Sequence, residues 1–165
     1  MKISYKTILT FLFLVLISGE IYSQPYINIS STDAAGNSIE LDSLLQKGPV
    51  FISFWATWCK PAKDQLTFMQ TIYTKYKEQG FSFLAVCQDN SKSLPAVTSY
   101  INSNNFTFPV ILDSEKVIFN SYNLSEVPTS LLINSRKEIV FANSGYTQSD
   151  DSKIEEEIGK ILTMR

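Results

Sequence analysis

The chain has 165 residues, enough for one domain with a substantial core, and 44% of them are hydrophobic. Its formal net charge of −2 is too small to indicate a nucleic-acid or membrane-surface partner. The absence of histidine excludes Ser-His and Cys-His nucleophile pairs and most zinc or haem ligand sets. Two cysteines, Cys59 and Cys87, are too few for a disulfide framework.

The start of the chain has the pattern of an export signal. Lys2 and Lys6 precede an apolar run at 8–17, and small residues lead to a candidate cleavage site after Ser23. The run is shorter than the roughly 20 residues that a membrane-spanning helix needs. An uncleaved N-terminal anchor is the alternative interpretation. We expect cleavage to leave residues 24–165 as one domain in an oxidising exported compartment, periplasmic or secreted, with no stable membrane anchor.

Hydrophobic periodicity predicts alternating strands and helices along the rest of the chain. In order, the expected elements are a strand at 26–30, a short helix at 39–45, a strand at 49–54, a helix at 65–76, a strand at 81–87, a helix at 91–103, a strand at 108–113, a short helix at 115–122, a hairpin of 128–134 with 138–142, and a helix at 151–164. Because a helix separates the strands at 49–54 and 81–87, we expect them to be parallel, with a right-handed crossover.

Cys59 stands where a buried strand gives way to a helix, in the stretch Phe-Trp-Ala-Thr-Trp-Cys-Lys-Pro-Ala of residues 54–62. Unpaired backbone N–H groups give a helix N-terminus partial positive charge, which favours a thiolate there. Pro61 suits the first turn, where a proline loses no intrahelical hydrogen bond. Lys60 could help to hold the thiolate or could be a solvated side chain.

The Trp-Cys-x-Pro pattern of Trp58, Cys59 and Pro61 after a buried strand resembles the active site of the thioredoxin superfamily. The stretch Phe-Trp-Ala-Thr-Trp-Cys of residues 54–59 is most similar to that of the TlpA/ResA-like thiol–disulfide oxidoreductases, which have an AhpC/TSA-redoxin type domain and work outside the cytoplasm. The resemblance implies a thioredoxin-like α/β fold, with helices around a central mixed sheet and the helix-strand insertion of that branch. It also implies Cys59 as the nucleophile, protein disulfides or thiols as partners, and no cofactor or metal ion.

Ala62 departs from the family, in which a second cysteine occupies this position. A dithiol enzyme uses that cysteine to resolve its mixed disulfide, and alanine cannot do so. We therefore expect Cys59 to act as a monothiol whose release depends on an external thiol. Two further departures fit this expectation, because Ser53 and Gln65 stand where the family often carries acids. Asp64 could substitute, but a first-turn aspartate is usually a helix-dipole partner.

Val127 and Pro128 match the cis-proline turn that lies beside the active cysteine in the family and contacts an extended partner chain. A trans proline beginning a strand is the alternative. The wall and substrate-binding surface of the site are therefore expected to comprise Trp58, Lys60, Pro61, Ala62, Val127 and Pro128.

Cys87 is a candidate accessory thiol, because it ends the strand predicted to lie beside the one leading to Cys59. A buried, inert strand cysteine is the preferred interpretation, since a disulfide needs Cα atoms within about 7 Å of one another. The acids at turns are scattered and predict no metal site; they are Asp33, Asp42, Asp89 and Asp113.

Three functional classes follow. The first is a monothiol oxidoreductase acting on exported protein disulfides through Cys59. The second is a catalytically degenerate binding module that keeps the peptide groove beside Pro128. The third, a peroxide-reducing redoxin, ranks last because such proteins place an arginine near the cysteine, and this chain has only Arg136 and Arg165.

Overall fold

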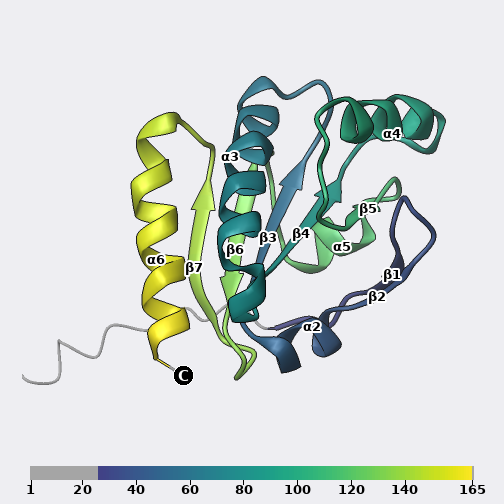
Figure 1. Ribbon diagram of the computed structural model, residues 1–165. Coiled ribbons are helices and arrows are strands. Elements are labelled where there is room, and N and C mark those ends of the chain that lie inside the picture. Colours follow the sequence, from purple (N-terminus) through teal and green to yellow (C-terminus); the bar gives the residue numbers. More distant parts are fainter. Residues whose placement is uncertain (1–25, 165) are drawn as a thin grey trace, which may run out of the picture.

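The computed structural model describes residues 26–164, so the predicted signal segment and its cleavage site lie outside the described residues (Figure 1). Across residues 26–164, no helix has both the length and the apolar character needed to cross a membrane.

A five-stranded mixed sheet forms the centre of the fold, with the strand order β5-β4-β3-β6-β7. Its strands are β3 (Val50–Trp55), β4 (Ser82–Cys87), β5 (Val110–Leu112), β6 (Thr129–Ile133) and β7 (Ile139–Ser144). The pairs β3–β4 and β4–β5 are parallel, whereas β3–β6 and β6–β7 are antiparallel. The predicted parallel unit and hairpin are therefore both confirmed.

Helices cover both faces of this sheet. They are α2 (Leu41–Lys47), α3 (Lys60–Tyr76), α4 (Leu94–Ser103), α5 (Val117–Ser121) and α6 (Asp151–Thr163). Side chains of α3, α4 and α6 share one apolar cluster, and those of α2 and α5 share the other. Figure 1 shows α3 and α6 side by side in front of the sheet, where Lys75 pairs with Glu155. This is the thioredoxin-like α/β arrangement that the resemblance predicts.

The central strand β3 is fully buried, which explains its nearly continuous apolar sequence. Its side chains alternate between the two clusters, with Phe51 and Trp55 facing α3 and Phe54 facing α5. Burial of each of these large side chains stabilises the fold by roughly 1.5–3 kcal/mol relative to exposure to water. Ser53 is the polar exception on the α3 face.

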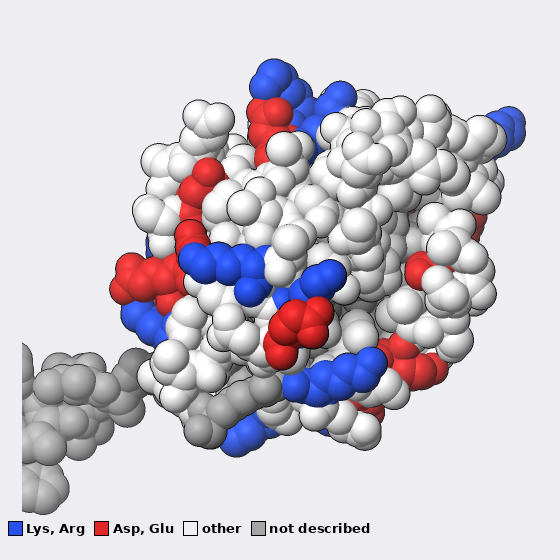
Figure 2. All heavy atoms as spheres, viewed as in Figure 1, with Lys and Arg blue, Asp and Glu red and all other residues white. Residues whose placement is uncertain are grey.

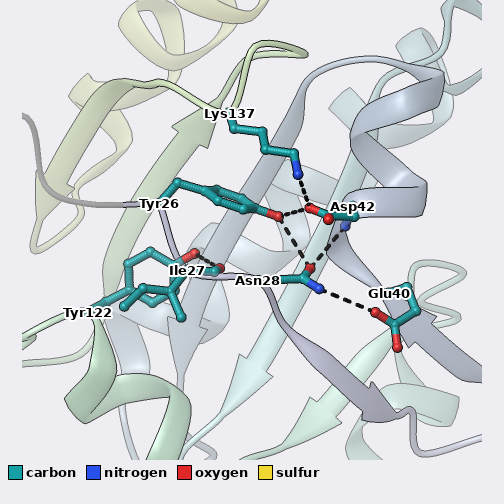
Figure 3. A network of polar contacts seen from close by, with 7 residues as sticks. All are labelled: Tyr26, Ile27, Asn28, Glu40, Asp42, Tyr122 and Lys137. Carbon is teal, nitrogen blue, oxygen red and sulfur yellow. Dashed lines mark hydrogen bonds and ion pairs between the residues drawn. The ribbon is translucent and has the colours of Figure 1, made fainter.

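The segment before β1 differs from the sequence prediction, which placed a strand at 26–30. The structure pairs β1 (Ser30–Thr32) with β2 (Ser38–Glu40) instead. Residues 26–29 are held by side chains, as Figure 3 shows: the Tyr26 hydroxyl donates to Asp42, and Lys137 forms an ion pair with the same carboxylate at 2.9 Å. Alternation of polar and apolar residues cannot distinguish a segment held by side-chain contacts from a strand, because a strand also needs a partner strand for its backbone hydrogen bonds.

Tyr122 fastens this segment to the second face of the sheet. Its hydroxyl donates to the carbonyl of Ile27 at 2.6 Å. Burial raises the pKa of Tyr122 to about 12, so the hydroxyl keeps its proton at neutral pH.

We predict that Tyr122→Phe lowers the free energy of unfolding by about 1 kcal/mol, because it removes this donor and leaves the Ile27 carbonyl without its partner. Urea denaturation at pH 7 measures the change. Tyr73→Phe is the matched control, because Tyr73 packs on Phe108 and makes no hydroxyl hydrogen bond within the described chain. Equal midpoints for wild type and Tyr122→Phe would contradict the prediction.

Candidate active site around Cys59

Cys59 caps the N-terminus of α3, as predicted from the sequence. Its N–H donates to Ala56 at 3.1 Å, and its carbonyl accepts the N–H of Lys63 at 3.1 Å as the first bond of the helix. Its backbone is extended, and its side chain makes no capping hydrogen bond. The sulfur therefore remains available to groups outside the helix.

The sulfur of Cys59 points at the loop before β6. Its Sγ lies 3.4 Å from the carbonyl oxygen of Val127, close enough for a thiol hydrogen bond. The peptide bond between Val127 and Pro128 is cis, which confirms the predicted turn. The helix N-terminus and the cis-proline loop thus meet at a cysteine that is partly exposed.

The other predicted wall residues differ in exposure. Trp58 is 70% exposed, a large apolar surface directly before the nucleophile. Lys60 is also exposed, and its ammonium group pairs with Asp64 at 2.6 Å. Pro61 lies in the first turn of α3 and is exposed. Ala62 is fully buried, so the side chain at the position of the second cysteine faces the core.

Three buried, neutral side chains lie beneath this helix turn. Ser53 and Ser130 are register partners on β3 and β6. The Ser53 hydroxyl donates to Gln65 Oε1 at 2.6 Å, and Gln65 Nε2 donates to the Ser130 hydroxyl at 2.9 Å. All three residues are fully buried. The cluster therefore satisfies its own polar groups without a titratable member, which is the condition for stable burial.

Cys87 lies in a different environment from Cys59. It is fully buried at the end of β4, directly opposite Trp55 of β3. Its thiol donates to Asp89 Oδ2 at 3.1 Å. Burial raises the pKa of the Cys87 thiol, which keeps it protonated at neutral pH. Both cysteines are free thiols in the structure.

No group of three or more cysteine, aspartate or glutamate side chains suited to a metal ion occurs in residues 26–164. Figure 2 shows charged side chains of both signs interspersed on the face that carries α3 and α6. The surface seen there offers no broad area of one charge.

Two residues near the site escaped the sequence analysis. The place of Ser130 in the site could be inferred only from the strand register, which pairs it with Ser53 of the neighbouring strand. Asp89 was counted among scattered turn acids, yet it is buried and accepts hydrogen bonds from Thr57. The available signal was its place just after a strand parallel to β3, since parallel strands end at the same edge of a sheet.

Comparison with known proteins assigns the chain to a family. Residues 23–142 match the AhpC/TSA family. The chain belongs to the AhpC/TSA family. Two relatives are both called thiol-disulfide oxidoreductase ResA. The protein of Bacillus anthracis is 38% identical, and the match covers 68% of this chain and 64% of the relative. The protein of Bacillus subtilis is 37% identical, and the match covers 72% of this chain and 64% of the relative. The chain thus spans slightly less than two thirds of the length of these relatives.

Solved structures share the fold of this AhpC/TSA chain. A thiol:disulfide interchange protein of Chlorobium tepidum superposes with a TM-score of 0.74 at 19% identity, covering 87% of this chain and 99% of that one. StoA of Bacillus subtilis gives 0.66 at 24% identity, covering 81% and 97%. Peroxidoxin BcpB of Mycobacterium tuberculosis gives 0.71 at 13% identity, covering 87% and 97%. At these identities, the likeness concerns the fold.

We predict that iodoacetamide modifies Cys59 in the native protein and reaches Cys87 only after unfolding. Cys59 is partly exposed, whereas burial keeps the Cys87 sulfur inaccessible and raises its pKa. Mass spectrometry of peptides alkylated with and without urea distinguishes the two sites. Native labelling of Cys87 as fast as that of Cys59 would contradict the burial described above.

We also predict that Gln65→Glu makes stability depend on pH. A protonated carboxyl can accept from Ser53 and donate to Ser130 as the amide does, whereas a buried carboxylate lacks a counter-charge. Burial should raise the pKa of the introduced group above about 4.3. The variant then matches wild type below about pH 4, and as pH rises it loses up to about 1.4 kcal/mol per unit until the folded-state pKa is passed.

Urea denaturation between pH 4 and pH 8 measures this difference. Gln46→Glu is the control, because it adds the same charge at an exposed position of α2. A constant difference between Gln65→Glu and wild type at every pH would show that the cluster tolerates a charge.

Proposed function

We propose that this chain is an exported thiol–disulfide oxidoreductase that acts on protein disulfides through one nucleophilic cysteine, Cys59. The observation that carries the proposal is the position of this cysteine: at the N-terminus of the 17-residue helix α3, with its sulfur 3.4 Å from the carbonyl of Val127 and a buried Ala62 one turn later. The export signal predicted from the sequence before residue 24 and the names of the relatives support the same proposal.

The proposed reaction is thiol–disulfide exchange. The Cys59 thiolate attacks one sulfur of a partner disulfide; a bond forms between the two sulfurs, and the partner's other sulfur leaves as a thiolate that takes a proton from water. Partial charge at the start of α3 favours the attacking thiolate. The exposed Trp58 and the partly exposed Val127, which precedes the buried Pro128, offer the surface against which a partner chain lies.

Ala62 determines what happens to the mixed disulfide. No thiol follows within the first turn, and the only other cysteine, Cys87, is fully buried. Resolution then requires two equivalents of an external thiol: the first displaces the partner as a thiol, and the second regenerates Cys59 and releases the external disulfide. Without that thiol, the covalent complex ends only when the partner's own released thiol attacks it again and restores the starting disulfide.

A catalytically degenerate binding module is the second candidate. The fully buried Ala62 and the neutral cluster of Ser53, Gln65 and Ser130 favour it, since both depart from a dithiol site. In that case, partner binding is unchanged in Cys59→Ser. The peroxidase candidate is weaker, because Arg136 lies in the turn between β6 and β7, at the opposite end of β3 from Cys59.

We predict that Ala62→Cys lets the protein complete one full reduction of a peptide disulfide without an external thiol. Residues three apart in the first helical turn lie within the Cα range of a disulfide, so the introduced thiol can resolve the mixed disulfide by forming a bond with Cys59. Wild type with a disulfide-bonded peptide and no added thiol should stop at one covalent adduct per chain. Ala62→Cys should release the reduced peptide and leave an internal disulfide.

Mass spectrometry of the reaction without reductant measures both products. Ala62→Ser is the matched control, because it adds one heavy atom at the same buried position without a resolving thiol. An unmodified Cys59 in wild type after prolonged exposure to the peptide would reject the oxidoreductase and favour the binding module.

A further inference from the structure

Asp89 lies at the same edge of the sheet as Cys59, two residues after the end of β4. It is only 5% exposed, and its carboxylate accepts three hydrogen bonds. Thr57 supplies two of them, from its N–H to Oδ2 at 2.7 Å and from its hydroxyl to Oδ1 at 2.7 Å. The Cys87 thiol supplies the third, at 3.1 Å to Oδ2. A buried carboxylate needs such donors, because water cannot solvate it there.

These bonds act on the loop that carries the nucleophile. Thr57 precedes Cys59 by two residues, and the N–H of Gln88 donates to the carbonyl of Trp55 at 2.8 Å. The turn after β4 therefore holds this loop from one side. On the other side, the sulfur of Cys59 meets the carbonyl of Val127. Cys59 therefore lies between the turn after β4 and the loop before β6.

We propose that Asp89 is the positioning residue of this site. Its carboxylate fixes Thr57 and thereby holds the Cys59 sulfur in line with Val127 and the surface that an extended partner chain would occupy. The hydrogen bonds of Asp89 are with Thr57 and Cys87 rather than with the Cys59 sulfur, so it acts through the loop. The inference deepens the proposed function and rests on it, because alignment matters only if Cys59 reacts with a bound chain.

Asp113 offers a matched comparison within the same fold. It is 6% exposed and follows β5. Its carboxylate accepts the N–H groups of Ile118 and Phe119 at 3.1 and 2.9 Å and the side-chain amide of Gln88 at 3.3 Å. It thus fastens the start of α5 as Asp89 fastens the loop before α3. Removing either carboxylate leaves backbone N–H groups without their partner and destabilises the fold. The carboxylate of Asp113 contacts the turn after β4 through the side chain of Gln88, whereas the removal of Asp89 takes away both hydrogen-bond acceptors of Thr57, two residues before Cys59.

The test measures attack by Cys59 on two reagents well below the unfolding temperature. One is an extended peptide whose cysteine carries thionitrobenzoate, so that formation of the Cys59–peptide disulfide releases the coloured thiolate. The other is iodoacetamide, which needs access to the sulfur but no alignment with a bound chain. We expect Asp89→Ala to slow the peptide reaction about tenfold and to change the iodoacetamide reaction by less than about threefold.

Three further variants separate positioning from general loss of stability. Thr57→Val, which removes the hydroxyl donor, should slow the peptide reaction in the same direction as Asp89→Ala. Asp89→Asn keeps an acceptor for the Thr57 N–H and should restore most of the rate. Asp113→Ala should lower stability without changing either rate. Hydrogen exchange of the Thr57 amide should accelerate in Asp89→Ala and remain slow in Asp113→Ala.

The outcomes separate the two proposals. If wild type reacts with the peptide and Asp89→Ala reacts equally fast, or if Asp113→Ala loses the same rate, the positioning role is rejected while the proposed function stands. If wild type does not react with the peptide, the proposed function fails. In that case, hydrogen exchange of the Thr57 amide tests whether Asp89 holds the loop before α3. Equal exchange rates in wild type and Asp89→Ala would show that it does not.

Discussion

The pairing of β3 on both sides is the constraint on which the site depends. Trp55 pairs with Cys87 of the parallel strand β4, and Phe54 pairs with Thr129 of the antiparallel strand β6. A parallel neighbour ends at the same edge of the sheet, and an antiparallel neighbour begins there. The turn after β4 and the cis-proline loop before β6 therefore both meet the residues that follow β3. A slip of one residue would reverse every side chain of β3 and move Ser53 away from α3.

The polar groups behind Cys59 form a consistent set. Ser53, Gln65 and Ser130 satisfy one another without a charge, and Ala62 presents only a methyl group to the same core. A buried acid costs free energy unless it is neutral or paired, and it is useful to a dithiol site as a proton acceptor for the second thiol. Where no second thiol exists, a neutral amide gives the same packing and hydrogen bonds without that cost.

The sequence predicts most of the fold because its strongest signals are long and local. The apolar run of β3, the helical spacing in α3 and the resemblance around Cys59 together locate the nucleophile, and the cis bond before Pro128 follows from the resemblance. The predicted boundaries err mainly at the start of the described chain, where side-chain bonds of Tyr26 replace the ladder of a strand. Such bonds join residues far apart in sequence, so no local pattern contains them.

Residues near the site were missed for a related reason. An aspartate after a strand is usually solvated, and the sequence offers no sign that Asp89 faces Thr57 until the two strand ends are placed side by side. Ser130 looks like an ordinary polar position of a hairpin, although the register places it opposite Ser53 in the core. In both cases, residue type was visible and the partner was not, because the partner comes from tertiary pairing.

The two cysteines show how environment divides the roles of one side chain. Cys59 is partly exposed at a helix N-terminus, whereas Cys87 is buried and bound to Asp89. A buried thiol with a raised pKa is a poor nucleophile, so the environment of Cys87 disfavours it as the source of the resolving thiol that Ala62 does not provide. Under the proposed function, the lifetime of a covalent complex at Cys59 is then set by external thiols and by how well the bound chain shields the sulfur from them. The fold determines how Cys59 captures a partner, whereas the thiols in the surrounding solution determine when the partner is released.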